Sequence, residues 1–258
     1  MGILNITPDS FYKESRVISV NTALKRADKM IREGADILDI GGESSRPGSD
    51  PVSEEEELKR ILPVINALIK KFDIPVSVDT YKSAVARAVL EEGVSIINDI
   101  SGLRFDPNMA KTIASANAGV IIMHISGKPK TMQKNPSYKS LMREITAYLK
   151  RGIKQAVSSG IKESSIIVDP GIGFGKKFSH NITILKKLKQ LQKLKKPILL
   201  GLSRKSFIGK ILDLPVEERL EGSIAASVFG IINGAQILRT HDVKETKRAL
   251  AVADAIIH

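Results

Sequence analysis

One pattern repeats along the whole chain and decides what it can fold into. A short run of apolar and β-branched residues ends in a polar residue, a loop follows, and an amphipathic segment with helical spacing comes next. Strands that alternate with helices pair in parallel, and strands that are apolar on both faces lie in a sheet covered on both sides. The runs predict eight strands, at residues 2–6, 36–40, 75–78, 95–97, 119–123, 165–168, 197–200 and 235–238.

The segments between these runs carry the signals of helices. Residues 20–33 repeat apolar positions at spacings of three and four, and Gly34 follows as a C-cap. Ser53 precedes a run of glutamates that begins with Glu54, Glu55 and Glu56, which is typical of a helix start because the Ser oxygen caps free N–H groups and negative charge suits the helix dipole. Further helices are predicted at residues 81–92, 107–117, 138–159, 181–195, 216–232 and 243–257.

Two α/β architectures fit this alternation, a closed barrel and an open doubly wound sheet. Eight strand–helix units in 258 residues favour a single (β/α)₈ TIM barrel over residues 1–258, since about 250 residues is usual for that fold. An open sheet more often has a Gly-rich nucleotide-binding turn after its first strand, whereas here Asn5 begins a polar segment that runs to Ser10. No linker or low-complexity tract divides the chain.

Composition excludes several classes of function. Cysteine is absent, so disulfides and thiolate metal sites are excluded. The formal net charge is +12, but the chain has only seven Phe, four Tyr and no Trp to stack on bases, so we expect no nucleic-acid partner. The chain lacks an apolar run of the ~18 residues that a membrane span needs, and its N-terminus lacks the features of a secretory signal. We therefore expect a cytoplasmic protein without membrane contact.

Polar side chains follow all eight predicted strands, at the barrel end where chemistry usually takes place. A single polar residue at such a point is usually a helix cap, but eight strand ends around one mouth favour a site. They fall into hydrogen-bond acceptors, which suit an amino-substituted nitrogen heterocycle, and a cationic group, which suits phosphate oxygens. The first group is Asp79, Asn98 and Asp169, and the second is Arg46, Lys205, Arg239 and His241.

The glycine-rich segment 171–176 fits neither standard nucleotide motif. A P-loop needs Gly where Pro170 stands, and a dinucleotide fingerprint needs Gly or Ala where Lys176 stands. We expect a loop that lets Phe174 cover a ligand. Lys205 lies beyond its strand, which favours contact with substrate over a Schiff base. The polar segment 127–131 fits either a lid or an ordinary surface loop.

A metal, if present, must be held by oxygen or imidazole. His124 and His241 lack the spacing of a zinc pair. Mg²⁺ keeps several waters and binds substrate phosphates with few protein ligands, so Asn5 after the first strand is a sufficient protein ligand. We therefore expect Mg²⁺ as the cofactor, held by Asn5.

Eight stretches form a specific combination: MGILNITPDSF at 1–11, DIGGESSRPG at 39–48, SVDT at 77–80, INDI at 97–100, MH at 123–124, DPGIGFGK at 169–176, GLSRKS at 201–206 and RTHDV at 239–243. With them the chain resembles the dihydropteroate synthase family of pterin-binding enzymes over essentially its whole length. The resemblance implies a homodimeric transferase of folate biosynthesis, which condenses (7,8-dihydropterin-6-yl)methyl diphosphate with 4-aminobenzoate. The alternative is a pterin-dependent methyltransferase of the same fold, which needs no diphosphate-binding cluster.

The resemblance also implies residue roles. The pterin diphosphate would be bound by Ser45, Arg46, Asp79, Asn98, Asp169, Lys205, Arg239 and His241. The 4-aminobenzoate would be bound by Pro47, Phe174, Lys205 and Ser206. The catalytic residues would be Asp9, Asp79, Asp169 and Lys205, and Thr7 and Phe11 would belong to loops that order as lids.

Overall fold

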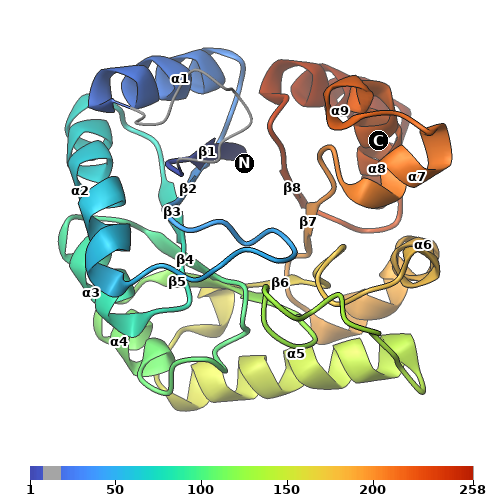
Figure 1. Ribbon diagram of the computed structural model, residues 1–258, viewed down its shortest axis with the longest axis horizontal. Helices are drawn as coiled ribbons and strands as arrows, with labels where there is room; N and C mark the ends of the chain where they lie inside the picture. Colours follow the sequence, from blue (N-terminus) through green and yellow to red (C-terminus); the bar gives the residue numbers. More distant parts are fainter. Residues whose placement is uncertain (8–18, 258) are drawn as a thin grey trace.

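The computed structural model describes residues 1–7 and 19–257, so the expected catalytic Asp9 and lid residue Phe11 lie outside the described residues. Figure 1 shows helices arranged as a ring around the strands, with α1 beside α9 where the two ends of the chain meet. The strands are β1 (Gly2–Asn5), β2 (Leu38–Gly41), β3 (Val76–Asp79), β4 (Ile96–Asp99), β5 (Gly119–Met123), β6 (Ile166–Asp169), β7 (Leu199–Gly201) and β8 (Ile237–Arg239).

The strands form a closed parallel barrel. Strands β1 to β6 pair with their neighbours in sequence order, and β7 pairs with β8. Isolated parallel bridges join these two groups at both edges, Val168 with Ile198 and Gly2 with Thr240. At the second edge the N–H of Ile3 donates to the carbonyl of Thr240 at 3.0 Å. The expected (β/α)₈ TIM barrel is therefore confirmed, and every strand lies within two residues of its predicted bounds.

Alternation along each strand separates a helix-facing layer from the barrel interior. The helix-facing side chains join one large apolar core that includes Leu38, Ile40 and Val78. Inside the barrel a smaller cluster fills the space, made of Met1, Ile121 and Leu199 with Ile37, Ile96, Ile167 and Ile237. Since side chains two positions apart point to the same face, Asp39, Asn98, Asp169 and Arg239 also face the interior, just beyond this plug.

The helices are α1 (Val20–Arg32), α2 (Glu54–Lys71), α3 (Ser83–Glu91), α4 (Met109–Ser115), α5 (Leu141–Ser158), α6 (Phe178–Lys186), α7 (Ser206–Leu212), α8 (Leu220–Ile232) and α9 (Val243–Ile257). Both expected caps are confirmed. The N–H of Glu56 donates to the Ser53 hydroxyl at 3.2 Å, and Gly34 takes a left-handed φ of 95° after α1. None of these described helices is long and apolar enough to cross a membrane.

Two helix predictions were wrong in part, and one helix was missed. The single helix expected at 181–195 is instead α6 followed by a 3₁₀ helix, Leu188–Leu194. Its buried Leu188, Leu191 and Leu194 recur every three residues, a repeat that a 3₁₀ helix places on one line. The helix expected at 216–232 begins as a 3₁₀ turn, Val216–Glu218, before α8. The short helix α7 after β7 was missed.

Candidate active site

Arg239 is the hub of the polar layer inside the barrel. Its Nε donates to Asp39 Oδ2 at 2.5 Å, and its Nη2 donates to Asp79 Oδ2 at 3.1 Å. The amide of Asn98 also donates to Asp39 Oδ2, at 3.3 Å. One guanidinium therefore holds two carboxylates that come from neighbouring strands, while the second oxygen of Asp39 has no hydrogen-bond partner among the described residues.

Burial and charge act against each other at this hub. Burial raises the pKa of Asp79 to about 7, although the charge of Arg239 lowers it. For Arg239, burial disfavours the guanidinium, but the charges of Asp39 and Asp79 outweigh this and hold its pKa above the usual value. Asp79 is therefore poised between its two protonation states near neutral pH, whereas Arg239 stays cationic.

Two glycines leave space beside the hub. Gly41 pairs with Asn5 on one side and with Asp79 on the other. A side chain at Gly41 would lie 3.4 Å from Asn5 Oδ1 and 3.8 Å from the Cβ of Asp79. Gly201 pairs with Arg239 in the same way. Both glycines occupy inward-facing positions, so the strand ends enclose room for a flat ligand above the apolar plug.

Lys205 and Asp169 form the opposite side of the mouth. Lys205 Nζ donates to the carbonyl of Ile172 and lies 4.7 Å from the ring centre of Phe174. Burial lowers the pKa of Lys205 to about 8, and Asp169 opposes this. Burial raises the pKa of Asp169, and Lys205 opposes that shift. Asp169 also accepts the N–H of Gly171 at 2.6 Å, which fixes one of its oxygens and leaves the carboxylate beside the lysine.

His241 lies beyond β8 and is held by Ser203. Its Nδ1 is 2.9 Å from the Ser203 hydroxyl, and its backbone N–H donates to the same oxygen at 3.2 Å. Burial and then the charge of Arg239 lower the pKa of His241 to about 4. Grouping His241 with the cations was therefore wrong: the imidazole is neutral at pH 7 and can donate one hydrogen bond. The charge of Arg46 also contributes to this pKa, which brings the loop after β2 near His241.

The loop after β2 carries Ser45, Arg46 and Pro47, and its start is firmly held. Glu43 accepts hydrogen bonds from Tyr81 at 2.6 Å and from Lys82 at 2.5 Å. Arg46 and Pro47 themselves are exposed, Ser45 is half-buried, and Ser206 is exposed at the start of α7. Thr7 is buried at the far end of the first strand. The strand ends thus bring the expected polar groups to one mouth, with the loop residues at its edge.

Three polar residues at strand ends have structural contacts instead. Asp99 accepts the N–H groups of Ser101 and Leu103, at 2.7 and 2.9 Å, and closes a turn. Arg204 pairs with Asp242 at 2.8 Å. His124 is buried against Lys176 Nζ, 2.9 Å away, and burial lowers its pKa to about 2.

Sequence reasoning missed Asp39 and Ser203 as contacts of the site. Asp39 lies inside a buried strand, where an unpaired carboxylate is too costly to be tolerated. It also follows the interior residue Ile37 by two positions, so the strand alternation was a usable signal. The pairing of Ser203 with His241 joins positions 38 residues apart, and no local pattern indicates it.

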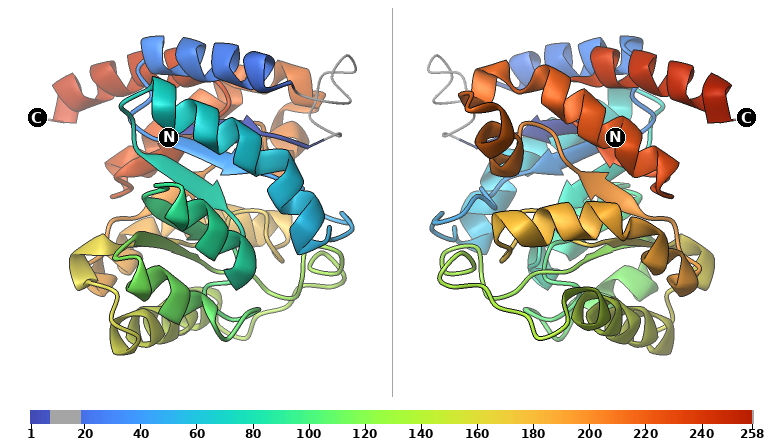
Figure 2. Two further views of the ribbon diagram at one scale, coloured as in Figure 1. Left: turned by 90° about the vertical axis from the view of Figure 1, so that its left-hand side faces the viewer. Right: turned by 90° about the vertical axis from the view of Figure 1, so that its right-hand side faces the viewer.

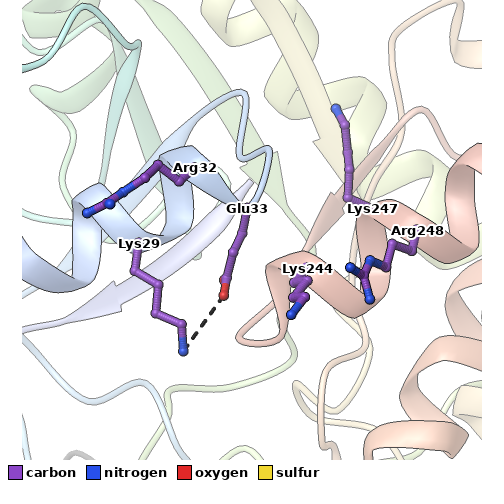
Figure 3. A pocket seen from close by; sticks show the side chains of 6 residues that line it. All are labelled: Lys29, Arg32, Glu33, Lys244, Lys247 and Arg248. Atoms are coloured by element: carbon purple, nitrogen blue, oxygen red, sulfur yellow. Dashed lines mark ion pairs between the residues drawn. The ribbon is translucent and has the colours of Figure 1, made fainter.

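A different concave region lies outside the barrel between the end of α1 and the start of α9 (Figure 3). Its volume is about 560 Å³, and it is lined by Lys29, Arg32, Glu33, Lys244, Lys247 and Arg248. Most of its basic groups have acidic neighbours: Lys29 pairs with Glu33 at 3.7 Å, and Lys247 pairs with Asp36 at 3.0 Å. It lies between two helices outside the barrel and away from the polar strand ends, so the strand ends remain the candidate active site.

Comparisons with known proteins show the family to which this fold belongs. A family profile described as "Pterin binding enzyme" matches residues 1–241. A dihydropteroate synthase of Clostridium beijerinckii is 47% identical over 258 residues, which is 100% of this chain and 93% of the relative. The structure of a Yersinia pestis dihydropteroate synthase with a sulfonamide drug superposes with a TM-score of 0.95 at 42% identity, covering 100% of this chain and 93% of the other. A Clostridium difficile dihydropteroate synthase, solved in the presence of pteroic acid, gives a TM-score of 0.93 at 47% identity, covering 99% and 95%.

Proposed function

The chain belongs to the dihydropteroate synthases of the pterin-binding enzyme family, and from its site we propose how its residues carry out that reaction. The reaction joins (7,8-dihydropterin-6-yl)methyl diphosphate to 4-aminobenzoate and yields 7,8-dihydropteroate and pyrophosphate. The C–O bond between the pterin methylene and the diphosphate breaks, and its electron pair leaves with pyrophosphate. The aniline nitrogen then forms the new C–N bond and releases a proton to solvent. We take residues 1–258 as one domain for this purpose.

The pterin ring is bound, in this proposal, by Asp79, Asn98, Asp169 and Lys205. A dihydropterin presents several N–H donors along one edge and a carbonyl oxygen, which complement two carboxylates, an amide and an ammonium. The inward positions of the two carboxylates and the space at Gly41 support this role. As the leaving group departs, positive charge develops on the pterin methylene, and the carboxylates of Asp79 and Asp169 stabilise it.

The diphosphate is bound by Arg239, His241, Ser45 and Arg46. Arg239 stays cationic, and neutral His241 can donate a hydrogen bond to a phosphate oxygen, which supports their role with the leaving group. Because this cluster has no purpose in methyl transfer from a folate, it also argues against the pterin-dependent methyltransferase. Asp9 lies outside the described residues and stays a predicted catalytic residue. Thr7 and Phe11 stay predicted lid residues.

Mg²⁺ fits the oxygen donors available at the carboxyl end of β1, where Asn5 lies. The described residues contain no cluster of three His, Asp or Glu side chains that could hold a metal, so a metal here depends on substrate oxygens and water. The Asn5 amide oxygen faces the space over Gly41, and it is the protein ligand we propose. When bound, Mg²⁺ would neutralise charge on the diphosphate.

The 4-aminobenzoate binds at the outer edge of the site, between Phe174, Lys205, Pro47 and Ser206. Phe174 offers an aromatic face next to the Lys205 ammonium, and a flat anionic aromatic ring complements both groups. Lys205 thus adjoins both substrates. The order of events follows from these positions: the pterin fills the interior, and the aminobenzoate approaches its methylene from the mouth.

One observation carries the proposal: two inward carboxylates, on β3 and β6, face an arginine and a lysine inside one closed barrel. The test is pyrophosphate release from the pterin diphosphate, with and without 4-aminobenzoate. We expect Asp169→Ala to raise the KM for the pterin and to lower kcat, while Asp213→Asn, an exposed site after α7, leaves both unchanged. Unchanged kinetics in Asp169→Ala would refute the assignment.

We also propose a homodimer. Of the nine exposed large apolar side chains among the described residues, seven lie on α7, α8 and α9, including Phe229, Ile232 and Val252. An apolar surface concentrated on adjacent helices is typical of a contact between copies. Ile232→Glu should therefore convert a dimer to a monomer in light scattering, and Val157→Glu, an isolated exposed position on α5, should not. A cytoplasmic location and the lack of a nucleic-acid partner stay predictions from the sequence.

A further inference from the structure

The segment between β5 and α5, residues 124–140, makes hydrogen bonds with two other loops of the described chain. We call it the β5–α5 loop. On one side it meets the β2–α2 loop, residues 42–53, and on the other the β6–α6 loop, residues 170–177. Within it, residues 127–131 fitted either a lid or an ordinary surface loop. Both neighbouring loops carry residues of the proposed aminobenzoate site.

On the β2–α2 side, two contacts hold the stretch that follows Pro47. The N–H of Gly48 donates to the carbonyl of Pro129 at 3.1 Å. Lys130 Nζ donates to Asp50 Oδ1 at 2.6 Å. Pro129 is buried, so the backbone bond lies on a packed surface and not on a free tip.

On the β6–α6 side, two contacts hold the backbone on either side of Phe174. The Gln133 side-chain amide donates to the carbonyl of Gly173 at 2.5 Å, and the Tyr138 hydroxyl donates to the carbonyl of Gly175 at 2.7 Å. The two loops also lie very close together, since a side chain at Gly175 would overlap the backbone of Ser126. The peptide that carries Phe174 is therefore fixed at both ends by the β5–α5 loop.

The β5–α5 loop is itself rigidly held. Met132, 3% exposed, packs with Ile100, Met123 and Ile125 in an apolar cluster, and Phe174 packs against the same cluster. The N–H groups of Thr131 and Met132 both donate to the carbonyl of Lys128, at 2.8 and 2.7 Å. A tight turn with a buried side chain at its tip can transmit position from one neighbour to the other.

We propose that the β5–α5 loop is a positioning element that sets the separation between Pro47 and Phe174, and that Gln133 is its principal positioning residue. This inference rests on the proposed function for the assignment of those two residues to 4-aminobenzoate. The loop touches neither substrate. We expect its main effect on the second substrate, because Asp79, Asn98 and Asp169 of the proposed pterin site lie on β3, β4 and β6 inside the barrel.

The test separates the two substrates by their KM values. Gln133→Glu keeps the shape of the side chain but removes its donor, and we expect the KM for 4-aminobenzoate to rise about fivefold, as for the loss of roughly one hydrogen bond. The KM for the pterin diphosphate should change less than about twofold. Gln133→Lys restores a donor and should return the KM for 4-aminobenzoate toward the wild-type value. Lys134→Ala, the exposed neighbouring residue, is the matched control and should change neither KM.

A second pair tests the other end of the loop. Lys130→Glu and Asp50→Lys each replace attraction by repulsion, and each should raise the KM for 4-aminobenzoate. The double variant, which restores an ion pair of reversed polarity, should recover most of the loss. If the double variant is no better than the singles, the ion pair does not set the position of the β2–α2 loop and this arm overturns the proposal.

Phe174→Ala distinguishes failure of the inference from failure of the proposed site. If Phe174→Ala raises the KM for 4-aminobenzoate while Gln133→Glu does not, the positioning role is refuted and the site stands. If Phe174→Ala has no effect on that KM, the proposed site fails and the positioning role fails with it. Equal changes in both KM values for Gln133→Glu would indicate a general loss of structure and would also refute the inference.

Discussion

The buried carboxylate of Asp79 should make the protein less stable than it would be without that charge. A pKa raised above its ordinary value of 3.8, to about 7, means that the folded protein binds a proton more tightly than the unfolded chain does. The stability linked to this group is fully present below about pH 4 and is lost as pH rises through about 7. At about 1.4 kcal/mol per pH unit, the ionised Asp79 lowers the free energy of unfolding above pH 7 by at most about 4 kcal/mol.

Asp79→Asn removes the charge and keeps the shape. We expect its free energy of unfolding to exceed that of the wild type by up to roughly 4 kcal/mol at pH 8.5, and by less than about 2 kcal/mol at pH 5. Urea unfolding at both pH values, with m-values compared, measures this difference. The same variant should lose pterin binding, so the residue that costs stability is one that function requires.

Asp106 provides a control of opposite sign. It accepts the N–H of Ser83 at 2.7 Å, at the start of α3. Although its partial burial acts the other way, hydrogen bonds from Ser83 and Asn108 lower its pKa. Its stabilising effect is thus fully present above about pH 4 and is lost only below that, so Asp106→Asn should destabilise by the same amount at pH 8.5 and at pH 5. If Asp79→Asn is less stable than the wild type at pH 8.5, or if its advantage is the same at both pH values, the reasoning fails.

Three further predictions concern the neighbours of this group. Asp39→Asn removes a charge that raises the pKa of Asp79, so the acidic limb of kcat/KM for the pterin diphosphate should move down by about one pH unit; an unmoved limb would contradict the shared-arginine arrangement. Ser203→Ala leaves His241 without its partner, and KM for the pterin diphosphate should rise about fivefold with the melting temperature nearly unchanged. Gly171→Ala places a methyl group against a backbone carbonyl at a φ of 68°, and should lower the free energy of unfolding by roughly 3 kcal/mol in urea.

The barrel could be predicted from the sequence because its signals are local and repeated. Each strand shows its apolar run within three to five residues, and caps such as Ser53 and Gly34 mark helix ends directly. The helices that the sequence did not predict correctly have a form that depends on tertiary packing. The Leu188–Leu194 segment has ordinary helix-forming residues, and only burial of one leucine every three positions favours its 3₁₀ form. Figure 2 shows why the strand ends were a sound guide: the strands point toward one side, where the loops of the site gather.

The sequence indicates which polar residues follow the strands at the candidate site, but it does not indicate which of them pair with one another. A polar residue after a strand can be read from the sequence, yet its partner depends on how the barrel closes. Arg239 reaches Asp39 across 200 residues and Asp79 across 160 residues, and only closure of β8 against β1 brings them together. Likewise, His241 reads as a cation until burial is known.

The division of the site into an anion half and a heterocycle half needs revision for the same reason. Arg239 would bind the diphosphate, but in the structure it is paired with both Asp39 and Asp79. A diphosphate that attracts Arg239 would weaken the partner of Asp79, and pterin N–H groups would replace that partner. The pterin end of the substrate therefore gives Asp79 new hydrogen-bond donors when the diphosphate end attracts Arg239 away from it. The pKa of Asp79 is about 7 and that of Lys205 is about 8, so both groups titrate close to neutral pH. A small change in the charged groups around them is therefore enough to fix the protonation state of each. The two ends should bind together more tightly than their separate affinities imply, because each alone leaves a buried charge without its partner.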